Sequence, residues 1–218
     1  MATWGSGTGK WGTITGWALN NTASPETNKR ETAHSKTNNA IASKLYDKRI
    51  EISETYNATQ KATAPAIPAN IGLLNDLPMT NLQINTFQDN FAQMVIAGHE
   101  HVDGTDNGAV RSVAHGITIE RAFGVSMFGF TQVDEPTESS VTVECDHAET
   151  PAGGAEAASG NTGAGENHNP RITLSITAHD GYASPPSGFE VQEKRPGTDA
   201  EGFATYTTVA VKDLAFAE

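Results

Sequence analysis

The sequence predicts a mainly β fold, with two tandem, related β-sandwich or barrel domains and a flanking helix near the join. Three observations lead to this prediction. Apolar residues alternate with polar ones at a period of two in several β-branched segments, as in strands with one buried face. The 218-residue chain contains 21 Gly and 10 Pro, which indicates many turns. An internal repeat relates the first half of the chain to the second.

Residues 1–10 are expected to form a flexible N-terminal arm. Gly7, Gly9 and Gly12 have the spacing of a dinucleotide-binding fingerprint. That fingerprint needs a strand before it and a helix after it, so that the pyrophosphate meets the helix amides. The few residues before Gly7 are not strand-like. Lys10 follows Gly9 as in a phosphate-binding loop, but Trp11 stands where that loop requires Ser or Thr.

Residues 11–113 are expected to form the first domain. Ile50 and Ile52 alternate with polar neighbours and indicate a strand, whereas Lys29–Leu45 fits either a polar helix or a strand with a loop. One stretch has helical spacing, with apolar residues at Phe87, Phe91, Met94 and Val95. Gly98 follows this stretch, and a glycine suits the end of a helix. We therefore expect a helix near residues 85–97.

Residues 114–218 are expected to form the second domain. Strand-like alternation occurs in four segments: Ile117–Ile119, Val141–Cys145, Ile172–Thr177 and Thr205–Val211. The stretch near residues 150–169 is rich in Gly, Ala and Asn. Such a composition predicts an inserted surface loop.

The repeat appears when the chain is compared with itself. At an offset of 113 positions, the matching residues are Gly16-Trp17 with Gly129-Phe130, Glu31 with Glu144, and His34 with His147. At an offset of 122 positions, Arg49–Ser53 matches Arg171–Ser175. Each half thus contains a Gly–aromatic pair, an acidic segment with a histidine, a loop, and a strand. The alternative is that two unrelated β regions share common strand residues.

The chain is acidic, with 14 basic and 26 acidic residues and a net charge of −12. Residues 1–113 carry a net charge of −1 and residues 114–218 carry −11, so the halves face different surroundings or have drifted in charge on solvated faces. No basic tract is present to hold DNA phosphates. No apolar run approaches the roughly 18 residues of a membrane helix, and the N-terminus lacks the apolar region of a secretory signal.

No catalytic, cofactor-binding or metal-binding residue is predicted. His99, His101 and Asp103 alternate, so they would share one face of a strand, but the further ligands of a metal site are missing. The segment from Asp103 begins like a calcium loop, yet Ala114 stands where a bidentate Glu is needed. A polar turn explains these residues better.

The remaining reactive side chains favour structural roles. Cys145 is the only cysteine, so no intrachain disulfide forms, and its inward strand position favours a buried, inert thiol. His34 and His147 occupy matching places in the repeat, which also favours a structural role. The paired carboxylates of Asp134-Glu135 precede Pro136, as in a solvated turn. No Gly-x-Ser-x-Gly elbow occurs, so we expect that the protein is not an enzyme, and a hydrolase is the least favoured class.

The order of these features resembles the tail tube proteins of tailed bacteriophages. In the first half, Gly16-Trp17 opens a strand, and an acidic segment and a loop lead to Arg49–Ser53. In the second half, Gly129-Phe130 leads through Asp146-His147 to Pro170–Thr177, and Asp199–Lys212 is similar to the closing strands of such a unit. The resemblance is one of pattern and order. It covers most of both halves and includes no diagnostic signature.

Proteins of that family have a β-sandwich or barrel with a flanking helix, and they form stacked rings around a DNA channel. The resemblance therefore implies a structural virion protein, made in the host cytoplasm and located in the phage tail. Its implied partners are copies of itself, other virion tail proteins and, transiently and without sequence specificity, the passing DNA. No membrane partner and no cofactor are expected.

Two fused units imply that three chains fill six ring positions as a pseudo-hexamer. The common members have one domain and use six chains, so this departure leaves the ring stoichiometry and the channel-lining residues open.

Two other classes of function remain open. Another virion structural protein, such as a head-decoration, tail-terminator or baseplate protein, would share the β content and the absence of enzymatic motifs. A carbohydrate-binding β-sandwich would present a platform of exposed aromatic residues. The three tryptophans, Trp4, Trp11 and Trp17, instead cluster near the N-terminus.

Overall fold

The computed structural model describes residues 9–34, 36, 40–61, 63–75, 77–101, 111–151 and 162–216. Within these ranges, only the backbone is described for residues 28–34, 40–48, 101, 148–151 and 162–167. The described part is all β and contains no helix. Its strands are β1 Trp17–Ala23, β2 Glu26–His34, β3 Ala40–Ala58, β4 Asn70–Leu74, β5 Leu77–Phe87, β6 Gln93–His101, β7 Val113–Ala114, β8 Pro136–Pro151, β9 Thr162–Ala178, β10 Glu190–Thr198 and β11 Ala204–Asp213.

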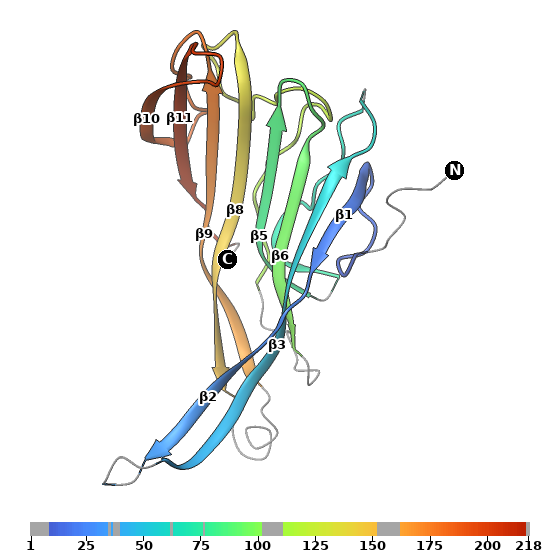
Figure 1. Cartoon of the computed structure of the whole chain (residues 1–218), viewed down its shortest axis with the longest axis vertical. Coiled ribbons are helices and arrows are strands. Elements are labelled where there is room, and N and C mark those ends of the chain that lie inside the picture. The colour runs from blue at the N-terminus through green and yellow to red at the C-terminus, as the bar shows by residue number, and fades with distance from the viewer. Residues whose placement is uncertain are drawn as a thin grey trace.

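The strands form one large, open, antiparallel sheet in the order β1-β3-β6-β5-β8-β9-β11-β10. β2 also pairs with β3, and β4 pairs with β5 and the short β7. Figure 1 shows β1 and β10 at opposite ends of the row of strands, and β2 with part of β3 as a long two-stranded arm. The prediction of a mainly β protein is confirmed.

Both halves of the chain contribute to a single hydrophobic core. Alternate residues of the central strands are almost completely buried, among them Ile52, Leu82, Ile84, Met94, Ile96, Val141, Val143, Ile172, Leu174 and Ile176. Trp11 and the segment before β8, with Ile119, Phe128 and Phe130, belong to the same cluster. Burial of one such side chain contributes about 1.5–3 kcal/mol.

The sheet is continuous across the predicted boundary between residues 113 and 114. β5 pairs with β8 from Asn81 opposite Glu144 to Phe87 opposite Glu138. A buried hydroxyl pair fixes this seam, because the Thr86 and Ser139 hydroxyl oxygens lie 2.7 Å apart. The Ser126 backbone completes the network: its N–H donates to Thr86 Oγ1 and its carbonyl accepts from Ser139. The two halves therefore share one sheet and do not form separate sandwiches.

The prediction of a helix near residues 85–97 is wrong. This segment contains the end of β5, a turn and the start of β6. Met94 and Ile96 are buried, whereas Val95 between them is half-buried, which is the alternation of a strand. Phe91 lies in the turn, where its ring makes an edge-to-face contact with Phe123 at 5.3 Å. The helical spacing therefore came from two strands and the turn between them.

The structure also tests several smaller predictions. Alternation correctly located strands at Ile50–Ile52, Val141–Cys145, Ile172–Thr177 and Thr205–Val211, but Ile117–Ile119 lies outside the strands. The ambiguous Lys29–Leu45 segment contributes to β2 and β3. The ends of the predicted loop at 150–169 belong to β8 and β9, and its centre, residues 152–161, lies outside the described residues.

The strands of the two halves follow the same spatial order. In the first half, the sheet order is β1-β3-β6-β5, and in the second half it is β8-β9-β11-β10. If β2, β4 and β7 are set aside, each half has four strands, and counted along the chain both orders are first, second, fourth, third. The seam between β5 and β8 thus joins the third strand of the first half to the first strand of the second.

Candidate functional site

The two edges of the sheet are the most distinctive surfaces of the described structure. In the part of the chain that is described, β10 pairs only with β11, and β1 and β2 pair only with β3. All nine residues of β10 are exposed, and so are residues 20–26 on the opposite edge. An exposed edge strand offers a row of backbone N–H and C=O groups to another chain. These edges are therefore candidate assembly surfaces.

The β10 edge carries charges of both signs. Arg195 Nε lies 3.2 Å from a carboxylate oxygen of Glu193. Lys194 is exposed, and its Nζ lies 5.4 Å from the centre of the Tyr182 ring. Val191 is 44% exposed, which is unusual for a β-branched apolar residue in a strand. This mixed edge is open to a partner strand.

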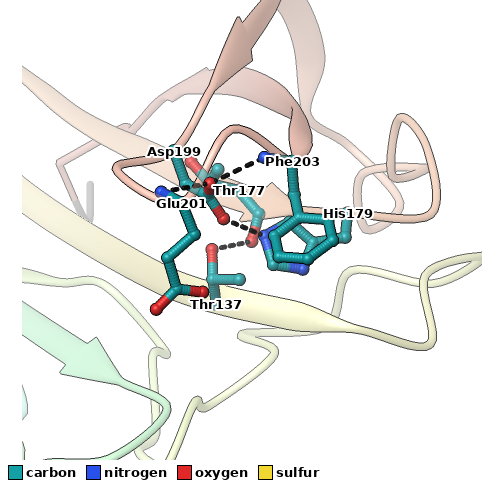
Figure 2. A network of polar contacts seen from close by, with 6 residues as sticks. All are labelled: Thr137, Thr177, His179, Asp199, Glu201 and Phe203. Carbon is teal, nitrogen blue, oxygen red and sulfur yellow. Dashed lines mark hydrogen bonds and ion pairs between the residues drawn. The ribbon is translucent and has the colours of Figure 1, made fainter.

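The turn between β10 and β11 is held by Asp199 (Figure 2). The Asp199 carboxylate accepts hydrogen bonds from the backbone N–H groups of Phe203 and Glu201, at 2.9 and 3.0 Å, and it lies 3.0 Å from His179 Nε2. The Phe203 N–H, followed by the other partners, lowers the pKa of Asp199 below its ordinary value. This network fixes the turn and presents the Phe203 side chain, which is 60% exposed.

A surface depression of about 650 Å³ lies beside this turn, with a lining that includes Gln88, Pro136, His179 and Phe203. The acidic pair Asp134-Glu135 lies at its margin. Both of their backbone N–H groups donate to the Asp180 carboxylate, at 2.7 and 3.3 Å. This arrangement is a solvated turn, as the sequence predicted.

The opposite edge is anchored by a buried carboxylate. Glu54 in β3 is 1% exposed and accepts hydrogen bonds from the Lys10 backbone N–H at 2.6 Å and the Tyr56 hydroxyl at 2.5 Å. Thr22 of β1 lies 3.4 Å from the same carboxylate. The Lys10 ammonium pairs with Glu100 at 2.6 Å. Residues 9–10 of the predicted flexible arm are thus held against the sheet, and residues 1–8 lie outside the described part.

The motifs that the sequence analysis rejected lie only partly within the described residues. The Gly12 N–H donates to the Gly9 carbonyl at 2.9 Å in a turn without the strand and helix of a phosphate-binding loop, and Gly7 lies outside the described residues. The His99 side chain is buried with its ring 4.8 Å from that of His147. The side chains of His34 and His101 and the whole of Asp103 lie outside the described part.

Cys145 is buried, and burial followed by the neighbouring carboxylates raises the pKa of its thiol to about 11. A thiol with this pKa is a poor nucleophile at neutral pH. Among the residues that the structure describes, no three His, Cys, Asp or Glu side chains form a group that could hold a metal ion.

The sequence analysis missed the β10 edge and Phe203. A third match between the halves points to them. At an offset of 112 positions, Thr86, Phe91 and Ala92 match Thr198, Phe203 and Ala204, and Asp89 matches Glu201. These residues form the β5–β6 turn and the β10–β11 turn, which are at corresponding places in the two halves.

No helix in the described part of the chain is long and apolar enough to cross a membrane. Comparison of the chain with models of known protein families gives no match, and comparison with curated protein sequences also gives none.

Proposed function

We propose that this chain is a structural virion protein whose copies assemble into stacked rings that form the DNA-conducting tube of a phage tail. The observation that supports this proposal is the repeated strand order, with a seam between the two halves and the same two kinds of edge left open at the ends of the sheet. The proposal includes the descent of both halves from one duplicated unit.

Strand register supports the duplication. Thr27 pairs with Arg49, and Glu144 pairs with Arg171. If Arg49 corresponds to Arg171, then Glu144 corresponds to Thr27, 117 positions earlier, and not to Glu31. The matches of Glu31 with Glu144 and of His34 with His147 are therefore displaced by four residues. The later strands match at an offset of 112 positions. Met94 pairs with Tyr56, and Tyr206 pairs with Ala178, which is the counterpart of Tyr56 at the offset of 122 positions. Tyr206 is therefore the counterpart of Met94.

The Gly–aromatic pairs keep the offset of 113 positions. Gly16 and Gly129 both have positive φ angles, of 88° and 84°. The N–H of the following aromatic residue donates to the carbonyl three residues earlier in each case, Trp17 to Ile14 and Phe130 to Met127. A Cβ atom on either glycine would come within about 3 Å of a proline side chain. The same tight turn thus lies directly before β1 in the first half and in the segment that leads into β8 in the second.

The way the halves join suggests how chains join. The internal seam is a head-to-tail contact between the third strand of one unit and the first strand of the next. Among the described residues, each chain still has an open first strand, β1 with β2, and an open third strand, β10. A head-to-tail contact that repeats gives a closed ring when its rotation closes. With two units in each chain, three chains provide six ring positions.

The charge of the chain agrees with a conduit for DNA. Its net charge of −12 repels phosphates, so DNA would pass without being held. A carbohydrate-binding surface has less support, because the exposed large apolar side chains of the described residues are Val191 and Phe203, which make no row of aromatic rings.

Sedimentation velocity and negative-stain electron microscopy test the proposal. We expect rings that contain three chains, show six-fold pseudo-symmetry in projection and stack into tubes at high protein concentration. A protein that stays monomeric from micromolar to millimolar concentration would contradict the proposal. Single rings that never stack would instead favour a terminator-type or baseplate protein.

A further inference from the structure

We propose that neighbouring copies join through one defined β-seam, in which residues 193–199 of one copy pair antiparallel with residues 21–27 of the next. In this seam, Thr198 lies opposite Thr22 and Lys194 lies opposite Glu26. The inference rests on the proposed ring assembly and adds the identity and register of the strands. It follows from transferring the β5–β8 register to the open edges.

Two series of residue pairings across neighbouring strands give the register. In the first half, Leu82 lies opposite Ile96, and Ile96 pairs with Glu54. In the second half, Lys194 lies opposite Thr208, and Thr208 pairs with Ile176. Ile176 is the counterpart of Glu54 at the offset of 122 positions. Lys194 is therefore the counterpart of Leu82.

On the other side of the seam, Val143 pairs with Ile172, and Glu26 pairs with Ile50, the counterpart of Ile172. Glu26 is therefore the counterpart of Val143. Because Leu82 lies opposite Val143 within the chain, Lys194 lies opposite Glu26 between chains.

The residues that this register brings together are chemically matched. Lys194 and Glu26 carry opposite charges, and directly opposed charges of this kind stabilise a strand pair. Thr198 and Thr22 are the counterparts of Thr86 and Ser139, whose hydroxyl oxygens lie 2.7 Å apart in the internal seam. A hydroxyl pair is thus available at the same place in both seams.

The exposure of the two edges agrees with the register. The transferred pairing covers mainly residues that are exposed in the single chain, namely residues 193–198 and residues 21–26. Pro25 does not interrupt the outer edge, because its carbonyl accepts from Glu51 N–H of β3 and so its backbone polar group faces inward. Pro196 lacks an N–H and removes one bond from the seam.

Phe203 provides a further observation that agrees with the seam. Its counterpart Phe91 packs against Phe123, which belongs to the segment that leads into β8. Phe203 is 60% exposed beside the depression described above. In the seam, the corresponding cover would come from residues 9–16 of the next copy, which lead into β1. Within its own chain the Phe203 ring lies 6.0 Å from the His179 ring, and in the proposed seam a second copy of this chain would cover its exposed side.

A charge exchange tests the seam. Lys194→Glu places two carboxylates opposite each other, so the protein concentration for half-maximal assembly should rise about fivefold or more. Glu26→Lys should have a similar effect, and the double variant Lys194→Glu/Glu26→Lys should recover assembly. Arg195→Glu is the matched control. It makes the same change of charge on the neighbouring residue, which would face Pro25, and it should not be rescued by Glu26→Lys.

Cysteine cross-linking tests the register. One chain carries Thr22→Cys, a second carries Thr198→Cys, and the mixture is assembled and oxidised while the buried Cys145 stays in place. We expect a disulfide-linked dimer from this mixture. Glu26→Cys mixed with Thr198→Cys is the control, since a shift of four residues separates the thiols by roughly 13 Å.

The outcomes separate the seam from the proposed function. Rings that cross-link through positions 22 and 198 support both. Rings that form without this cross-link, or that cross-link through positions 26 and 198, overturn the seam and leave the ring assembly standing. Absence of any oligomer overturns both.

Discussion

At the scale of single residues, Glu54 is the clearest example of a polar group that organises the fold. Its buried carboxylate receives donors from Lys10 and Tyr56, so it holds the segment before β1 on the sheet. Glu54→Gln replaces an acceptor oxygen with an NH2 group that faces a donor. We expect the free energy of unfolding to fall by about 1–3 kcal/mol in urea titrations. The control Glu51→Gln, at a carboxylate that is 40% exposed, should change it by less than about 1 kcal/mol. Equal effects of the two variants would refute the anchoring role.

Cys145 gives a prediction about reactivity. Because burial raises the pKa of its thiol to about 11, little thiolate is present at pH 8. The folded protein should react with a disulfide reagent such as dithionitrobenzoate only as fast as it unfolds, and the thiol should react at once in strong denaturant. Rapid stoichiometric labelling of the native protein would show that the thiol is accessible.

His115 gives a prediction about pH. Its Nε2 lies 2.6 Å from the Pro68 carbonyl and its Nδ1 accepts from the Ile117 N–H, so the ring is held neutral. Burial lowers the pKa of His115, and the Pro68 carbonyl offsets part of the shift. The unfolded state therefore binds a proton at higher pH than the folded state does. His115 is stabilising above the unfolded pKa of about 6.5, and this contribution is lost as the pH falls below it.

The variant His115→Gln tests this linkage, because its amide can still donate to the Pro68 carbonyl. Between pH 7 and pH 5, the variant should lose less stability than the parent protein in urea titrations. The lowered pKa values of Asp180 and Asp199 affect stability only near pH 4 and below, so they do not obscure this window. Parallel stability curves for the two proteins would contradict the assignment.

At the scale of elements, Gly98 in β6 shows how closely the strands approach. A Cβ atom at this position would lie 1.9 Å from the Pro78 carbonyl oxygen, which is a backbone atom that cannot move aside. Gly98→Ala should therefore lower the free energy of unfolding by more than about 2 kcal/mol. Ala210 in β11 is the counterpart of Gly98 and is fully buried, so Ala210→Gly is the matched control and should cost about 1 kcal/mol. Thermal unfolding of both variants measures the difference.

The accuracy of the sequence analysis varies with the kind of element. Val141–Cys145 and Ile172–Thr177 were located correctly because they are central strands with one buried face, and burial enforces alternation. β10 was missed because all its residues are exposed, so nothing in its sequence has to alternate. The segment from Phe87 to Val95 was misassigned because it spans two strands and a turn. In that turn, Phe91 is held by its contact with Phe123, far along the chain, and not by a helix period.

At the scale of the whole molecule, the sequence pointed to strands with the same place in the sheet order of each half, but it did not predict that order. The Arg49–Ser53 match with Arg171–Ser175 located corresponding strands, β3 and β9. The β5–β8 pairing joins residues more than fifty positions apart, such as Thr86 and Ser139, and no local pattern encodes it. The candidate assembly edges could not be predicted for the same reason. An edge of the sheet is a strand that lacks a neighbour on one side, so its identity depends on all the long-range pairings in the described sheet.

The continuous β5–β8 seam has a further consequence for how the circumference of an assembly would be determined. If the contacts between chains repeat the contact within a chain, then strand pairing alone does not determine how many units a ring contains. The angle between successive units would determine that number. Within each chain, the connection from β7 to β8, residues 115–135, packs Phe128 and Phe130 into the core, so we expect it to influence this angle. Substitutions in this connection would change the curvature of the ring, and therefore its inner diameter, without changing the edge strands that pair between chains.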